Sequence, residues 1–318
     1  MNENIKAAYK KTVNAIAVSL ALSIALLGVL AFLLAPLKSF CKEALGEEWA
    51  ELLTALLECG IYFVGFLIPA RLLGYFGTSS DLPKDEKEKP SLLWIAAVSC
   101  LSLALIILAS YANYFIVQSF SDYGDITQQS FGIRYLDKPH MMLLYLVSSA
   151  LVPAVCEELL FRGAVCRLLA KYGNCCAIVI SALIFALFHT NIAQILYTFA
   201  AGLLIGAIYL RTRSILCAML LHFANNALSA VKTILSYNGM GSAVLFIDAA
   251  ILLIGVCAAL CLMIIYSKNK KVCDRSNEHE CAQDMTKKEK TLGFFTPAMT
   301  LYVAYCVFAA VWYFCVSI

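Results

Sequence analysis

Charged residues are scarce in this chain of 318 residues. They make up 14% of it, and hydrophobic residues make up 62%, with a mean hydropathy of +0.80. Soluble domains carry about 25% charged residues, so the composition excludes a soluble fold and a disordered chain. The net charge of +3 is too small to indicate nucleic acid as a partner. The composition therefore predicts a polytopic membrane protein that works within a lipid bilayer.

Several motifs are also absent. The sequence has no Gly-rich phosphate loop, which argues against an ATP-driven pump, and no HExxH zinc motif. Its 14 cysteines form no disulfide pattern, because nearly all lie inside apolar runs and only Cys41 is expected in an extracytoplasmic loop. They are interpreted as small buried apolar residues. The adjacent Cys175 and Cys176 have no His or Cys partner at zinc-site spacing, so they are a weak metal signal.

Apolar runs of membrane-spanning character recur along the chain, since roughly 20 apolar residues cross the hydrocarbon core as a helix. The nine runs are 13–35, 52–73, 92–115, 141–161, 177–189, 192–210, 215–235, 243–266 and 297–317. The first follows three lysines like a signal sequence, but it is too long for a cleaved one and is kept as a spanning helix. The sequence predicts an all-α polytopic membrane protein with about nine transmembrane helices, eight to nine in number.

The basic residues predict the orientation of these spans. With a cytoplasmic N-terminus, cytoplasmic segments hold 19 of the 24 Lys and Arg residues. The five on the other side are Lys38, Lys42, Arg134, Lys138 and Lys232. Because loops rich in Lys and Arg stay in the cytoplasm, this distribution predicts that the N-terminus is cytoplasmic.

Three parts are predicted along the chain. Residues 1–140 hold the first three helices and a charged cytoplasmic linker at 78–90. Residues 141–235 form a core that carries the polar residues, and residues 236–318 hold further helices and a cytoplasmic loop at 268–291. The last apolar run, beyond that loop, is predicted to be an appendage. The chain has no internal repeat and no paired broken helices, so a secondary transporter is the least favoured reading.

Ionisable residues inside apolar runs are costly and are functional candidates by default. Glu157 and Glu158 lie near the end of the fourth run, with Arg162 four residues after Glu158. Residues four apart share a helix face, so Glu158 and Arg162 are expected to pair. Glu157 is left on another face without a local partner, where a desolvated carboxylate suits general-base chemistry. The alternative is that both carboxylates reach interfacial water. Pro153 is expected to kink the helix just before the pair.

Two further runs carry histidine. His189 follows Phe185 by four residues, and His222 precedes Asn226 by four residues. An imidazole and a carboxamide on one face offer hydrogen bonds to a developing oxyanion, although hydrogen bonding between helices is the alternative for both. In a straight helix His189 would lie far deeper than Glu157. The fifth and sixth runs are therefore expected to form a hairpin that turns within the membrane beside a wet cavity.

These motifs resemble the CPBP intramembrane proteases, the CAAX protease and bacteriocin-processing family also called ABI. Its motifs EExxxR, FxxxH and HxxxN are matched by the segments 157–162, 185–189 and 222–226. Phe161 and Gly163 fit the first motif, and 202–206 fits the glycine pattern before the third. The resemblance covers about 144–231, under a third of the chain.

The resemblance implies a helical core around an intramembrane cavity that opens to the cytoplasm, and hydrolysis of peptide bonds. Glu157 and His189 would activate water, while His222 and Asn226 would stabilise the oxyanion. Glu158, Arg162 and Phe185 would support the site. The expected substrates are peptides or proteins at the membrane, including lipidated or leader peptides. The expected location is the plasma membrane of a prokaryote.

Two questions stay open from the sequence. Glu157, His189 and His222 would also suit zinc with an open position, but a mechanism without a cofactor is favoured because Asn226 fits oxyanion stabilisation better than metal ligation. The alternative function is a non-catalytic peptide-binding protein that acts in bacteriocin self-immunity or as a scaffold. A scaffold would not need the complete set of site residues, so the protease is favoured.

Overall fold

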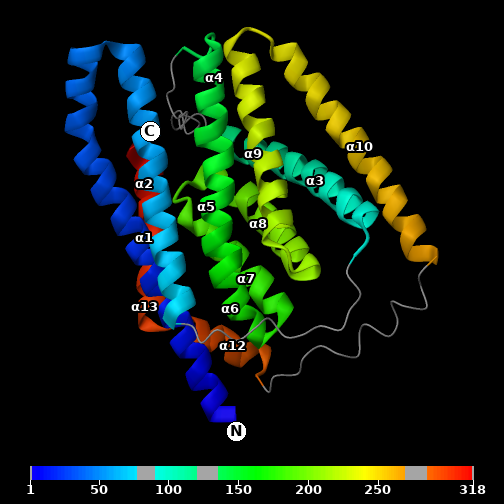
Figure 1. The fold of residues 1–318 in the computed structure, drawn as a ribbon. Helices are drawn as coiled ribbons and strands as arrows, with labels where there is room; N and C mark the ends of the chain where they lie inside the picture. The colour runs from blue at the N-terminus through cyan, green and yellow to red at the C-terminus, as the bar shows by residue number, and fades with distance from the viewer. Residues whose placement is uncertain (1, 77–89, 120–134, 269–284, 317–318) are drawn as a thin grey trace.

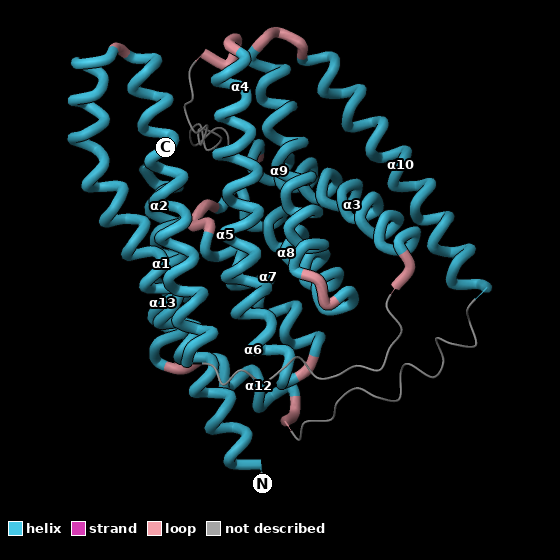
Figure 2. The backbone as a smooth tube through the Cα atoms, in the orientation of Figure 1, coloured by secondary structure: helices cyan, strands magenta, loops and turns pink. Residues whose placement is uncertain are grey.

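The computed structural model describes residues 2–76, 90–119, 135–268 and 285–316, and all the regular structure in these ranges is helical (Figures 1 and 2). The helices are α1 (Asn2–Leu45), α2 (Glu47–Phe76), α3 (Leu92–Gln118), α4 (Pro139–Leu146), α5 (Val152–Leu160), α6 (Arg167–Leu169), α7 (Asn174–Phe188), α8 (Ile192–Thr212), α9 (Ile215–Tyr237), α10 (Gly241–Lys268), α12 (Lys287–Phe294) and α13 (Pro297–Val316). The predicted all-α polytopic fold is confirmed.

Each predicted apolar run coincides with a helix, but the number of spans is lower than nine. Among the described residues, seven helices are long and apolar enough to cross a membrane, and α12 with α13, bent by 73°, makes up to eight. The remaining run forms α7, which has only 15 residues and falls short of a span. The count of nine is therefore approximate, and the chain is an integral multi-pass membrane protein.

The helices run between two ends of a bundle (Figure 1). The proximal end holds the N-terminus, α6, α12 and the turn between α8 and α9. The distal end holds the α1–α2 turn, the start of α4 and the α9–α10 turn. Polar contacts tie the distal end together: Lys138 pairs with Glu48, and the Asn238 side chain donates to the Leu136 carbonyl at 3.0 Å.

The hydrophobic core fills the proximal half of the bundle. Helix α1 contributes Tyr9, Val13, Ile16 and Leu20, none of them exposed, from its first half. Other fully buried members on neighbouring helices are Phe66, Leu160, Phe161, Val165, Cys166, Leu169, Ala177, Ile184 and Ala218. Lipid tails are as apolar as these side chains, so close van der Waals packing, and not the removal of apolar surface from water, holds the helices of this half together.

Segments α4, α5 and α6 form one helix, Pro139–Tyr172, with two π-helical interruptions. These are η2 (Val147–Leu151) and η3 (Phe161–Cys166), one on each side of α5. Pro153 lies just after the first and has no N–H to continue the hydrogen-bond ladder. Single-turn π segments recur at functional sites because they change which residues face inward. The expected distortion before the carboxylate pair is therefore present as a π segment.

Helices α7 and α8 form the predicted hairpin. Thr190 turns the chain with a φ of +47°, and Asn191 caps α8 by accepting a hydrogen bond from the Ala193 N–H at 2.9 Å. Asn191 is only 2% exposed although it lies at the turn. The polar side chain at the turn is therefore shielded by protein, as irregular backbone within a membrane protein requires of its polar groups.

Two sequence predictions are wrong, and a third concerns residues that the structure does not describe. Cys41 lies within α1 and is buried, not in a loop, because α1 continues past Pro36 to Leu45. Helix α13 is not an appendage, since Met299 and Cys306 belong to the core cluster. Residues 78–89 and 269–284 of the two predicted cytoplasmic linkers lie outside the described residues.

Helix α8 approaches α7 closely at Gly202. A Cβ at this position would lie 3.0 Å from both the Cα and the Cβ of Ala182, whereas a Cβ at Gly206 would meet Ile178 at 3.7 Å, an ordinary contact. We expect Gly202→Ala to push the hairpin apart and lower the free energy of unfolding by about 1–3 kcal/mol, and Gly206→Ala to leave it nearly unchanged. Thermal unfolding in detergent measures both. Equal effects of the two substitutions would contradict the close approach.

Candidate active site

A buried ion pair lies at the centre of the predicted site. Arg162 Nη1 donates to Glu158 Oε1 at 2.8 Å, and neither side chain is exposed to solvent. The predicted pairing of these two residues is therefore confirmed. Arg162 Nη2 also donates to the Gly202 carbonyl at 3.2 Å, and the guanidinium lies 4.7 Å from the centre of the Phe185 ring. One arginine thus connects η3 with α5, α7 and α8.

The same carboxylate orients His222 from α9. His222 Nδ1 lies 2.7 Å from Glu158 Oε1, and because a carboxylate only accepts hydrogen bonds, Nδ1 is the donor. The Phe185 ring stands edge-on to the imidazole with centroids 5.9 Å apart. These contacts fix the ring so that His222 Nε2 faces Glu157, with 3.8 Å between Nε2 and Oε2.

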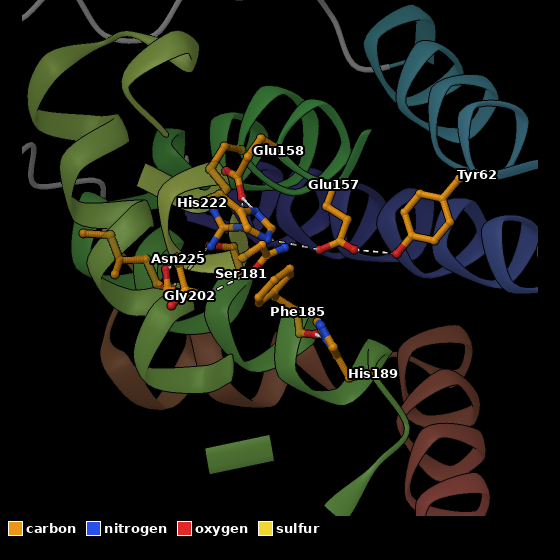
Figure 3. A network of polar contacts seen from close by, with 12 residues as sticks. Tyr62, Glu157, Glu158, Ser181, Phe185, His189, Gly202, His222 and Asn225 are labelled. Atoms are coloured by element: carbon orange, nitrogen blue, oxygen red, sulfur yellow. Dashed lines mark hydrogen bonds and ion pairs between the residues drawn. The ribbon is translucent and has the colours of Figure 1, made fainter. Parts of the chain in front are cut away.

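Glu157 receives a partner that the sequence did not reveal. The Tyr62 hydroxyl on α2 donates to Glu157 Oε1 at 2.6 Å (Figure 3). Tyr62 stacks on Phe66 with centroids 4.7 Å apart, which links it to the packed core. Glu157 therefore has no local partner, as predicted, but it lies between His222 and a tyrosine from a distant helix. No motif marks Tyr62, which is one aromatic residue among many in an apolar run.

His189 and Asn226 complete the predicted set. His189 ends α7; its Nδ1 lies 2.8 Å from the Phe185 carbonyl, and its ring packs edge-on against the Phe185 ring at 4.8 Å. Asn225 Nδ2 donates to Asn226 Oδ1 at 3.1 Å, so the amide N–H₂ is the group that Asn226 retains for a ligand. In the described part of the chain, His189 makes no ion pair with Glu157, and the contact of Glu157 is with His222 instead.

A cavity of about 630 Å³ brings these side chains to one surface. Its lining includes Tyr62, Glu157, Phe185, His189, His222 and Asn226. Glu158 and Arg162 are fully buried behind it, and the second Glu158 oxygen and the Arg162 Nε have no hydrogen-bond partner among the described residues. The site therefore consists of residues that face the cavity and, behind them, a buried ion pair that supports them.

The cavity extends from these residues to the distal end of the bundle, where Lys38 and Glu51 line it. The N-terminus lies at the proximal end (Figure 1). The cavity therefore extends toward the end of the bundle opposite the N-terminus.

The predicted zinc ligands do not form a metal-binding cluster. Within the described residues, no group of three or more His, Cys, Asp or Glu side chains is arranged to hold a metal ion. Of the three candidates, His222 uses Nδ1 on Glu158, and His189 uses Nδ1 on the Phe185 carbonyl.

The predicted site residues that line the cavity, and the ion pair behind them, lie in one continuous segment that resembles a known family. Residues 139–228 match the family of Rce1-like type II CAAX prenyl endopeptidases. This match confirms the resemblance seen in the motifs and spans all seven predicted site residues. No curated protein and no solved structure matches the chain. Tyr62 lies outside the matched segment.

The buried ion pair of Glu158 and Arg162 should contribute strongly to the free energy of unfolding. Arg162→Met leaves Glu158 charged and unpaired in a dry interior, so we expect the free energy of unfolding to fall by about 3–5 kcal/mol. Lys42→Met is the control, because its partner Glu47 lies at 2.6 Å but both side chains are more than 40% exposed, and such pairs contribute about 1 kcal/mol or less. Unfolding of the purified variants in detergent compares them. Similar losses for both would contradict the role given to Arg162.

Proposed function

We propose that this chain is an intramembrane endopeptidase that cleaves peptide bonds of membrane-associated substrates. The observation that carries the proposal is the convergence of Glu157, His189, His222 and Asn226 on one cavity within the segment that matches the endopeptidase family. A carboxylate, two imidazoles and a carboxamide at the surface of a cavity supply a base and hydrogen-bond donors, which are the groups that hydrolysis needs.

Glu157 is proposed as the general base. A water molecule in the cavity between Glu157 and His189 loses a proton to the Glu157 carboxylate and attacks the carbonyl carbon of the substrate. The carbonyl oxygen becomes an oxyanion, the C–N bond then breaks, and the proton passes to the leaving amine. Tyr62 acts as a positioning residue, because its hydroxyl holds one Glu157 oxygen while the other faces the site.

His222 and Asn226 are proposed to stabilise the oxyanion. For this role His222 has to present a proton on Nε2 to the substrate oxygen, while the Glu158 carboxylate at Nδ1 holds the orientation of the ring. Asn226 adds an amide N–H from the next turn of α9. Groups fixed before the reaction stabilise developing charge better than mobile ones, and Arg162 supplies that rigidity through Glu158.

The alternative function is a peptide-binding membrane protein without catalysis, acting in self-immunity or as a scaffold. The same cavity would hold the peptide. We favour the protease because binding alone does not call for a carboxylate held between a tyrosine and a histidine. We further propose a mechanism without a metal cofactor and a location in a prokaryotic plasma membrane.

Replacement of Glu157 tests the proposal. Glu157→Gln keeps the shape of the side chain but removes the base, so we expect cleavage to fall at least a hundredfold, the scale of general-base catalysis. The measurement is quantitative peptidomics of membranes from cells that express each protein at equal levels. New peptide termini are expected with the wild type and not with Glu157→Gln, and they should persist in the presence of a chelator.

Glu43→Gln is the matched control, since Glu43 lies exposed on α1 and should behave as the wild type. Wild-type termini in the Glu157→Gln sample would contradict the assignment of the base. Identical termini in all samples, including cells without the protein, would favour the peptide-binding alternative. Loss of cleavage on chelation would argue for a metal.

Tyr62→Phe tests the positioning of the base. The substitution removes a hydrogen bond to a charged group, worth about 1.5–3 kcal/mol, without changing the ring. We expect kcat for a cleaved peptide to fall about tenfold or more while KM stays within about twofold. Tyr237→Phe, at the exposed end of α9, is the control and should change neither value. A rise in KM with an unchanged kcat would contradict a role in positioning Glu157.

A further inference from the structure

The cavity is lined by only one half of each helix that reaches it. From α2 it takes residues between Glu51 and Tyr62, and from the helix Pro139–Tyr172 it takes residues between Tyr145 and Glu157. These are the halves that begin at the distal end. From α9, which runs the other way, it takes only residues from His222 onward. The lining thus starts at the proposed site and continues to the distal end.

Helices α3 and α8 also line the cavity with only one half each. The lining residues of α3 begin at Ile107, in its second half, and those of α8 end at Ile205, well before its end at Thr212. Arg211 lies over the Trp94 ring at 5.6 Å, which places the start of α3 and the end of α8 together, away from the cavity. Every helix that lines the cavity therefore does so on the same side of the site.

The opposite side of the site is closed by packed side chains. Directly behind Glu157 and His222 lie Arg162 and Phe161, both with no exposure, followed by Val165 and Leu169, also fully buried. Interiors packed at this density contain few voids larger than a water molecule. A peptide cannot reach Glu157 through this half without unfolding it.

The charge of the two ends orients the cavity in the membrane. Among the described residues, the distal segments carry four basic residues, Lys38, Lys42, Lys138 and Lys232, and the proximal segments carry twelve. The proximal ones are Lys6, Lys10, Lys11, Arg71, Arg167, Lys171, Arg211, Arg213, Lys268, Lys287, Lys288 and Lys290. Positively charged loops are retained in the cytoplasm, so the proximal end is the cytoplasmic one.

We infer that the cavity opens on the extracytoplasmic side of the membrane and receives peptide segments presented there. The inference rests on the proposed protease function and adds the substrate class: juxtamembrane segments of translocated or membrane-anchored chains. It reverses the cytoplasmic opening that the family resemblance implied. Lipidated tails that remain in the cytoplasm are excluded as substrates, because the packed proximal half separates them from Glu157.

The distal lining is suited to such segments. Lys38 and Glu58 face each other at 3.8 Å and are 56% and 45% exposed, so charged groups border the cavity on this side. Deeper in, Tyr62, Tyr197 and Phe185 provide aromatic walls beside the polar site residues. A substrate segment would therefore meet polar groups first and aromatic groups near the scissile bond.

Two native cysteines allow a direct test of the opening. Cys59 lines the cavity one turn before Tyr62, and Cys175 is exposed at the start of α7, at the proximal end. A membrane-impermeant maleimide is applied to intact cells or spheroplasts and, separately, to inside-out vesicles. Labelled sites are read by peptide mass spectrometry. Cys59→Ala and Cys175→Ala identify the signals, and Glu58→Cys adds a more exposed reporter on the distal side.

We expect label at Cys59 or at Glu58→Cys from outside and at Cys175 only in inside-out vesicles, with at least a tenfold preference in each case. Label at Cys59 or Glu58→Cys from the cytoplasmic side would overturn the inference. Label at neither position in either preparation would overturn it too, because the cavity would then not be open to water.

Mapping the cleaved peptide termini onto their parent proteins separates the inferred opening of the cavity from the proposed protease function. Peptide termini that depend on Glu157 are expected on extracytoplasmic segments of their parent proteins. Termini on cytoplasmic segments would overturn the opening and keep the protease. If the labelling pattern holds but no termini depend on Glu157, the opening stands and the protease function fails.

Discussion

The ion pair of Glu158 and Arg162 is the interaction on which the site depends. Moving a carboxylate and a guanidinium out of water costs several kcal/mol per ion, and this cost is offset only when both are paired at good geometry. The pair meets that condition with its 2.8 Å contact, and it also holds His222, Gly202 and the Phe185 ring. Five helical segments, η3, α5, α7, α8 and α9, are therefore positioned relative to each other by one buried charge pair.

The division of the bundle into a packed half and a hollow half follows from this arrangement. Side chains on the proximal side of the pair are apolar and interdigitate, so they exclude water. On the distal side, polar residues such as Glu157 and Asn226 need solvent or a ligand, and the cavity supplies it. The boundary between the halves is the layer that holds Glu157 and His222, with packed side chains behind it and the cavity in front of it.

Much of the site was predictable because its signals are local. Spacings of four residues place Glu158 with Arg162 and His222 with Asn226 on shared helix faces, whatever the rest of the fold does. The hairpin of α7 and α8 was also predictable, since a short apolar run that ends in His189 has to turn within the protein. Tyr62 was not, because its contact with Glu157 joins positions 95 residues apart and nothing in an apolar run marks the tyrosine that makes it.

The sequence by itself determined that the chain is an all-α membrane protein, which residues are out of place in an apolar setting, and which end of the bundle carries the positive charge. Composition and helical spacing are enough for that, because both act within one segment. Only the tertiary structure decided that His222 and not His189 contacts Glu157, and that the cavity lies on the side away from the N-terminus. These depend on how helices distant in sequence pack, since the buried halves of α1, α2, α5 and α7 fill one end and leave the other hollow.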